Sequence, residues 1–337
     1  MSKILIGIHG LGNKPSKRIL RRWWYKAIRE GLLGIGKVLP FPKFEIIYWA
    51  DVLNEKPLDH KCKDRNDPYY LQEKYTPAPK SFRAKSHTIR KTVLEMLEKQ
   101  MDKLFLNSDF SVNLSFVSDL LIHKYFRELE IYYTEDCVDK NNKSRPAKDI
   151  IREKMESLLS KHKDDDIFFI GHSMGSIIAY DVLTYRMPKI KIDTFVTMGS
   201  PLGLPVIKSK IAVEQKIKPN KNQKLISPPG IKKNWFNFSD LEDKVAMNYN
   251  LSDDYYENSH GVKPIDKIVY NNYQIENEHN PHKSYGYLRT PEFAAALYDF
   301  LTKDKSQFMI YLLNAFNYLF KNLFRAINSV KNLISGN

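Results

Sequence analysis

The strongest chemical signal in the chain is residues 171–175, GHSMG, in which Ser173 stands between two glycines. An apolar run at 167–170 precedes this pentapeptide, and a helical pattern at 176–183 follows it. A serine on so tight a strand-to-helix turn adopts a strained backbone, and the flanking glycines let strand and helix approach without Cβ clashes. We therefore predict that Ser173 is a nucleophile whose hydroxyl is exposed above a sheet.

A serine hydroxyl becomes a good nucleophile only when a base takes its proton and a carboxylate orients that base. After a serine on such a turn, the acid comes next along the chain and the histidine last. Three histidines follow Ser173: His260, His279 and His282. His282 lies in a polar loop before a helix expected near Pro291, so we predict it as the base, with His279 as the alternative.

The orienting carboxylate is expected where a strand ends near the serine. The apolar run 235–238 is followed by Asp240, Glu242 and Asp243. We predict Asp243 as the acid, with Asp240 as the alternative. An aspartate at this position can also cap a helix, which is the expected role of the one that is not used.

The negative oxygen that forms during acyl transfer needs hydrogen-bond donors, usually two backbone N–H groups. Met174 follows the nucleophile and begins a helix, where unpaired N–H groups collect, so it is one predicted donor. The glycine-rich stretch 9–13, HGLGN, directly follows the apolar run 4–8. We assign the second donor of this oxyanion hole to Leu11.

Together, these motifs resemble the α/β-hydrolase superfamily, most closely its lipase and esterase branch. The similarity rests on HGLG at 9–12, GHSMG at 171–175, GSPLG at 199–203 and the surroundings of Asp243 and His282. It covers about residues 1–303. The resemblance implies that Ser173, Asp243 and His282 form a catalytic triad and that no cofactor is needed.

The chain also departs from the pattern of that superfamily. The glycine-rich loop follows the first strand, so the two leading antiparallel strands of the eight-stranded pattern are expected to be absent. Lys244 stands where related sequences often have proline.

The elements expected around these motifs form an α/β fold with a doubly wound, mostly parallel sheet. Uninterrupted apolar runs predict buried parallel strands. They lie at 4–8, 44–49, 167–170, 195–198 and 235–238, with a weaker sixth at 267–273. Helical patterns at 17–30, 147–161 and 175–185 alternate with them, as in α/β sheets. Residues 1–50 and 146–305 are the predicted hydrolase core.

Two stretches interrupt this alternation. Residues 51–145 form a predicted helical insertion and candidate cap, with helices expected at 88–105 and 116–133. Residues 201–233 carry five prolines and many lysines. Long segments at the catalytic edge of a sheet often act as lids. We expect one of the two to cover the active site, whereas helices packed away from the site are the alternative.

Composition sets further limits. The 337 residues are 42% apolar and 27% charged, which is typical of globular proteins. Two cysteines and no apparent signal peptide suggest a cytoplasmic protein with free thiols. Neither metal-ligand spacing nor a nucleotide-binding glycine loop is found, so we expect no metal, no cofactor and no nucleic-acid partner. The net charge of +14 favours anionic partners, among them the inner membrane surface.

The last residues, 306–337, form a predicted amphipathic helix. Ten apolar side chains recur at helical spacing, between Met309 and Ile334. The longest uncharged run, 306–320, has 15 residues, too few to span a bilayer, which takes about 20. From Lys305 onward there are four basic residues and no acidic one, which suits an anionic membrane surface. Packing on the protein's own core and self-association are the alternatives.

These observations predict a serine hydrolase that cleaves carboxylic esters, with lipid or acyl esters as the favoured substrates. A thioesterase or a peptidase of the same fold is the first alternative, because a triad alone does not select the acyl bond. A catalytically idle, membrane-associated interaction protein is the second.

Overall fold

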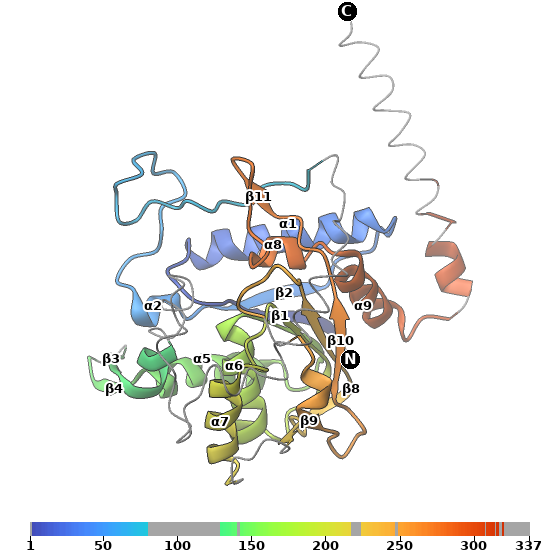
Figure 1. Ribbon diagram of the computed structural model, residues 1–337. Helices are drawn as coiled ribbons and strands as arrows, with labels where there is room; N and C mark the ends of the chain where they lie inside the picture. Colours follow the sequence, from blue (N-terminus) through green and yellow to red (C-terminus); the bar gives the residue numbers. More distant parts are fainter. Residues whose placement is uncertain are drawn as a thin grey trace, which may run out of the picture.

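The computed structural model describes residues 2–79, 129–139, 142–216, 224–246, 249–306, 308–313, 315, 316 and 319 (Figure 1). All helices, strands and contacts given for the protein belong to these residues.

The core is a six-stranded sheet in the order β10-β8-β6-β5-β1-β2, and all five neighbouring pairs are parallel. The strands are β1 (Lys3–Ile8), β2 (Lys43–Ile47), β5 (Asp166–His172), β6 (Ile192–Met198), β8 (Ile231–Ser239) and β10 (Pro264–Ile268). In β6 every residue is buried, as expected of a central parallel strand covered on both faces. The predicted α/β class with a mostly parallel sheet is confirmed.

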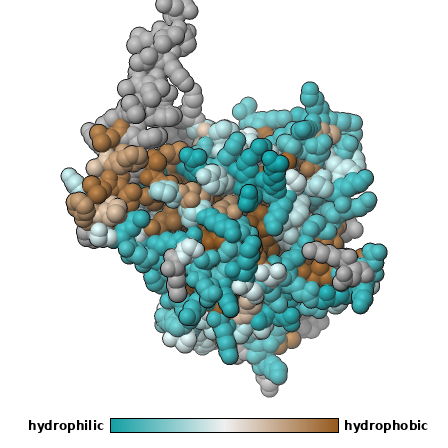
Figure 2. Space-filling model, turned by 180° about the vertical axis from the view of Figure 1, so that it is seen from behind, coloured by the Kyte–Doolittle hydropathy of each residue, from teal (hydrophilic) through white to brown (hydrophobic). Residues whose placement is uncertain are grey.

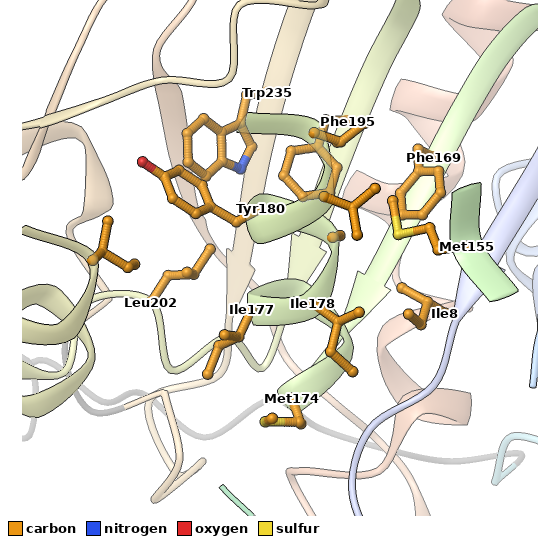
Figure 3. Close-up of a cluster of buried hydrophobic side chains, with 14 of the residues drawn as sticks. Ile8, Met155, Phe169, Met174, Ile177, Ile178, Tyr180, Phe195, Leu202 and Trp235 are labelled. Carbon is orange, nitrogen blue, oxygen red and sulfur yellow. The ribbon is translucent and has the colours of Figure 1, made fainter. Parts of the chain in front are cut away.

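Helices cover both faces of the sheet (Figure 1). One layer contains α1 (Lys17–Gly34), α8 (Ser284–Tyr287) and α9 (Pro291–Thr302), and the other contains α5 (Ala147–Lys161) and α6 (Met174–Asp181). Successive residues of a strand point to opposite faces. Accordingly, Ile4 and Ile6 of β1 join the apolar cluster under α5 and α6, whereas Leu5 joins the cluster with Trp24 of α1. Figure 3 shows the α6 side, where Tyr180 of α6 lies beside Trp235 of β8 and Ile178 lies on the side of Ile8 of β1.

The remaining elements are short. They are α2 (Ala50–Leu53), a π-helix (Val182–Arg186), α7 (Pro205–Glu214), a 3-10 turn (Leu251–Asp253) and the pairs β3 (Asp136–Val138) with β4 (Ser144–Pro146), β7 (Leu225–Ile226) with β9 (Tyr255–Tyr256), and β11 (Gln274–Ile275) with β12 (Glu278–His279).

The predicted helices lie close to the observed ones. The helix expected at 147–161 has those bounds as α5, and the one expected at 17–30 continues to Gly34. The pattern at 175–185 is divided between α6 and the π-helix. Trp23 and Trp24 are 7% and 0% exposed, so they are packing residues of α1 against the sheet.

The sixth strand is β10, and it differs from the predicted run at 267–273. It ends at Ile268, and the apolar residues Val269 and Tyr273 are buried in the loop that follows. An edge strand has one neighbour and a partly solvated face, so its own apolar pattern is weak. Here the loop packs back onto the core and supplies the apolar signal that the strand lacks.

After α2 the chain runs through residues 54–79 without a helix, and we call this segment the strap. The predicted helix at 88–105 lies outside the described residues, as does most of the one at 116–133. Residues 129–134 are helical. Leu129 and Tyr132 of this turn are buried in the α5 and α6 cluster.

Of the predicted C-terminal helix, residues 308–313, 315, 316 and 319 are described, and they are helical. Within the described part of the chain, no helix is both long and apolar enough to cross a membrane.

Candidate active site

Ser173 lies at the junction of β5 and α6, with φ 54° and ψ −131°. A Cβ atom at Gly171 would lie 2.9 Å from the Cα of Ser176, and one at Gly175 would lie 2.6 Å from the carbonyl oxygen of Ile8. Neither glycine therefore has room for a side chain. The pentapeptide forms the tight, strained strand-to-helix turn that its sequence predicts.

The expected exposure of the serine is wrong, because Ser173 is only 1% exposed. The loop after β1 passes directly beside it. A Cβ atom at Gly10 would lie 2.6 Å from the Cβ of Ser173 and 3.0 Å from Nδ1 of His172. Gly10 thus packs directly against the buried serine.

Three residues from separate parts of the chain meet at this turn. Ser173 Oγ lies 3.0 Å from Nε2 of His282, and Nδ1 of His282 lies 2.9 Å from both carboxylate oxygens of Asp243. An ionised carboxylate only accepts hydrogen bonds, so Nδ1 carries the ring proton and Nε2 is free to accept the serine proton. We call these three residues the relay.

The two candidate acids differ in what they contact. The Asp243 carboxylate accepts from His282, from the N–H of Val245 at 2.9 Å and from the Tyr287 hydroxyl at 2.7 Å. Asp240 instead accepts two backbone N–H groups, those of Glu242 and Asn271, each at 2.7 Å. Asp240 therefore holds two loops together, and burial raises its pKa.

The two candidate histidines are likewise separated. His279 lies in β12, where Nε2 donates to the carbonyl oxygen of Asn271 at 2.6 Å and Nδ1 lies 3.1 Å from Glu242. The loop carrying His282 is held by the side chain of Asn271, which donates to the carbonyl oxygens of Pro281 and Lys283. Of the two candidate histidines, only His282 thus reaches Ser173.

His172 also holds the loop that carries His282. Its Nε2 lies 2.7 Å from the carbonyl oxygen of His282, which can only accept, so Nε2 carries the proton. Burial, and next the charge of His282, lower the pKa of His172 well below 6.5. His172 is therefore a neutral, fixed donor. Sequence reasoning missed this role because it depends on a contact between residues 110 positions apart.

Gly199 is the third glycine that the site requires. Its φ is +54°, and a Cβ atom there would lie 2.8 Å from Oδ2 of Asp243 and 3.2 Å from Nδ1 of His282. Only glycine combines this backbone with the absence of a side chain. The GSPLG stretch at 199–203 was a signal for this position, but not for its contact with the relay.

The two predicted oxyanion donors lie on segments that meet at the serine. Met174 is the first residue of α6, where N–H groups have no partner within the helix. Leu11 follows Gly10, which abuts Ser173. The loop is anchored by His9, whose Nε2 accepts from the N–H of Trp49 at 3.1 Å, so that Nδ1 donates to the carbonyl oxygen of Gly10. Burial, and then the charge of Lys14, lower the pKa of His9 to about 3.

The strap joins this loop to the histidine loop. Near its start, the N–H of Leu58 donates to the carbonyl oxygen of Lys14 at 2.9 Å. Near its end, Glu73 pairs with Lys283 at 2.5 Å and accepts a hydrogen bond from Asn280. The strap thereby contacts both the segment that follows the β1 loop beside Ser173 and the loop that carries His282.

A hollow of about 880 Å³ lies elsewhere, beside the edge strand β2. Residues of both charges line it, among them Glu45, Asp51, Arg145 and Lys154, and no relay residue does. Among the described residues, no three His, Cys, Asp or Glu side chains are grouped so that they could hold a metal ion.

A parallel sheet with helices on both faces and a serine turn at the end of a central strand is an α/β-hydrolase-type fold. Residues 85–236 match the model of a family described as a PGAP1-like alpha/beta domain, which is a member of the α/β-hydrolase superfamily. No curated protein and no solved structure matches the chain.

The family match includes Ser173 and ends in β8, before Asp243 and His282. It also begins at residue 85, inside the predicted insertion. The match supports a hydrolase in general, and neither a lipase nor an esterase in particular.

Proposed function

We propose that this protein is a serine hydrolase that cleaves carboxylic esters, with lipid or acyl esters as its substrates. The observation that carries the proposal is the relay, with 3.0 Å between Ser173 Oγ and Nε2 of His282 and 2.9 Å between Nδ1 and Asp243. Nucleophile, base and orienting acid are thus in hydrogen-bond contact before any substrate binds.

In the proposed reaction, Ser173 Oγ attacks the ester carbonyl carbon while Nε2 of His282 takes its proton. The N–H groups of Met174 and Leu11 stabilise the resulting oxyanion. When the tetrahedral intermediate collapses, His282 returns the proton to the departing alcohol and leaves an acyl group on Ser173. Water then attacks this acyl-enzyme while His282 takes its proton, and His282 returns that proton to Ser173 Oγ as the carboxylic acid leaves. Asp243 stabilises the imidazolium ion in both halves.

The test is labelling of the full chain with a fluorophosphonate probe, followed by turnover of esters with graded acyl chains. Matched thioester and amide substrates distinguish the thioesterase and peptidase alternatives. Ser173→Ala is the control, and it should abolish labelling and lower turnover by about 10⁴-fold or more. Its unfolding transition should stay close to that of the parent, because only one hydroxyl is removed.

Failure of the folded wild-type chain to react with the probe would support the catalytically idle alternative. Undiminished turnover by Ser173→Ala would overturn the mechanism.

A further inference from the structure

The start of the C-terminal helix turns its apolar side outward. Ser306 caps this helix, with its Oγ accepting from the N–H of Met309 at 3.2 Å and its carbonyl oxygen accepting from the N–H of Ile310 at 2.9 Å. Phe308, Tyr311 and Leu319 are 70%, 69% and 66% exposed. These are among the most exposed large apolar side chains in the described part of the protein.

The exposed residues share one side of the helix. At about 100° per residue, Phe308, Leu312 and Leu319 lie on one face. Ile310 and Leu313, on the other side, are only half-buried. Hydrophobic side chains gather at the edge of the molecule seen on the left of Figure 2, where this helix begins. Phe308, Tyr311 and Leu319 thus do not pack on the core formed by the described residues.

The charge of the segment indicates what covers this face. Residues 305–337 contain Lys305, Lys321, Arg325 and Lys331 and no acidic residue, within a chain of net charge +14. A segment that begins with an exposed apolar helical face and carries only basic charges is attracted to the interface of an anionic bilayer by both of these properties. A second copy of the same cationic segment would repel it.

We propose that the helix beginning at Ser306 docks its apolar face, marked by Phe308, Leu312 and Leu319, on the surface of an anionic phospholipid membrane. The apolar side chains enter the headgroup region, and the net positive charge of residues 305–337 attracts the anionic lipids. This docking is independent of catalysis, so it does not depend on the proposed function.

The experiment is sedimentation of the full-length chain with two kinds of vesicle. One kind contains phosphatidylcholine alone, and the other also contains phosphatidylglycerol. The test variant is Phe308→Glu, and its control is Val213→Glu, at an exposed valine of α7 that is 65% exposed. The two variants carry the same net charge, so a difference between them reports the position and not the overall electrostatics.

We expect wild type and Val213→Glu to bind the phosphatidylglycerol vesicles alike and to bind phosphatidylcholine vesicles much more weakly. Phe308→Glu should reduce the partition coefficient by about tenfold or more, since one large apolar side chain no longer enters the interface. Added salt should weaken binding by the wild type.

Three outcomes would overturn the proposal. They are equal vesicle binding by both variants, no binding by the wild type, and a concentration-dependent dimer that Phe308→Glu abolishes while vesicle binding is absent. The last outcome would assign the face to a second copy of the chain.

Discussion

The hydroxyl of Tyr287 links the two candidate acids of the site. It donates to Oδ2 of Asp243 at 2.7 Å and accepts from the backbone N–H of Asp240 at 3.0 Å. Burial, followed by the charges of these two aspartates, raises the pKa of Tyr287 far above its ordinary value, so it remains a donor. Asp240 and Asp243 are close in the chain, yet the Asp243 carboxylate faces His282, whereas the Asp240 carboxylate holds two loops together.

We expect Asp243→Asn to reduce kcat by about 10⁴-fold, because an amide next to Nδ1 no longer selects the tautomer that the base requires. Asp240→Asn should lower the free energy of unfolding by about 1–2 kcal/mol, through weakened bonds to two backbone N–H groups, and leave most of the turnover. Ester hydrolysis and urea unfolding of both variants measure these effects. The reverse ranking of turnover would assign the acid to Asp240.

The histidines give a second comparison. His282→Ala removes the only imidazole that hydrogen-bonds Ser173 Oγ among the described residues, so probe labelling and turnover should both be lost. His279→Ala removes a bond to Asn271 and a contact with Glu242, which should cost about 1–2 kcal/mol of stability. If His279→Ala were the inactive variant, the base would be misassigned.

Gly199→Ala tests the space beside the relay. The new methyl group would meet Asp243 and His282, so we expect turnover to fall by about 100-fold or more, as misplacement of catalytic groups commonly does. Gly261→Ala is the matched control. Gly261 also has a positive φ, +71°, but no atom lies within 4 Å of its Cβ position.

Backbone strain should lower the free energy of unfolding by about 1–2 kcal/mol in each variant, and the contacts of the new methyl group should add to this cost in Gly199→Ala. Only Gly199→Ala should lose activity. A similar loss of activity in Gly261→Ala would show that the effect of Gly199→Ala comes from lowered stability and not from contact with the relay.

The strap offers a test of positioning. Glu73→Ala removes the partner of Lys283 and Asn280 on the histidine loop, and we expect kcat to fall by about 3- to 10-fold, equivalent to about 1 kcal/mol. Glu73→Gln retains an acceptor for Asn280 and should recover part of the loss. The control is Glu276→Gln, at an exposed ion pair between the strap residue Arg65 and β11–β12, which should change little.

The measurement is kcat and KM of each variant together with its unfolding midpoint. A change in the midpoint without a change in kcat would show that the strap acts on stability alone.

His172 predicts a pH dependence of stability. The pKa of His172 in the folded protein is well below 6.5. As the pH falls, His172 is therefore protonated in the unfolded chain at a higher pH than in the folded protein. This histidine therefore lowers the free energy of unfolding progressively as the pH falls below 6.5. His9 acts in the same direction. In His172→Gln the amide can still donate to the carbonyl oxygen of His282, but it does not titrate.

Urea unfolding at several pH values, followed by the fluorescence of the four buried tryptophans, measures the difference. The wild type should lose more stability on acidification than His172→Gln. Parallel pH profiles for the two would contradict the neutral, buried state of His172.

Elements built from contiguous residues were predictable. The turn at Ser173 is specified by GHSMG between an apolar run and a helical pattern, since its strain and close approach involve neighbours in the chain. For the same reason α5 has the predicted bounds, and the central strands lie on their apolar runs. The weak edge strand β10 was misplaced because its loop carries the apolar residues.

The sequence by itself thus determined the α/β class and the serine turn, and it predicted Ser173, Asp243 and His282 in their chain order as candidate nucleophile, acid and base. Tertiary structure alone decided that Gly10 packs against Ser173, that Gly199 lies against the relay and that Asp243, not Asp240, faces His282. It also decided that the C-terminal helix turns Phe308 outward. The physical reason is range: backbone sterics and periodicity act over a few residues, whereas these contacts join segments whose meeting depends on the packing of the whole sheet.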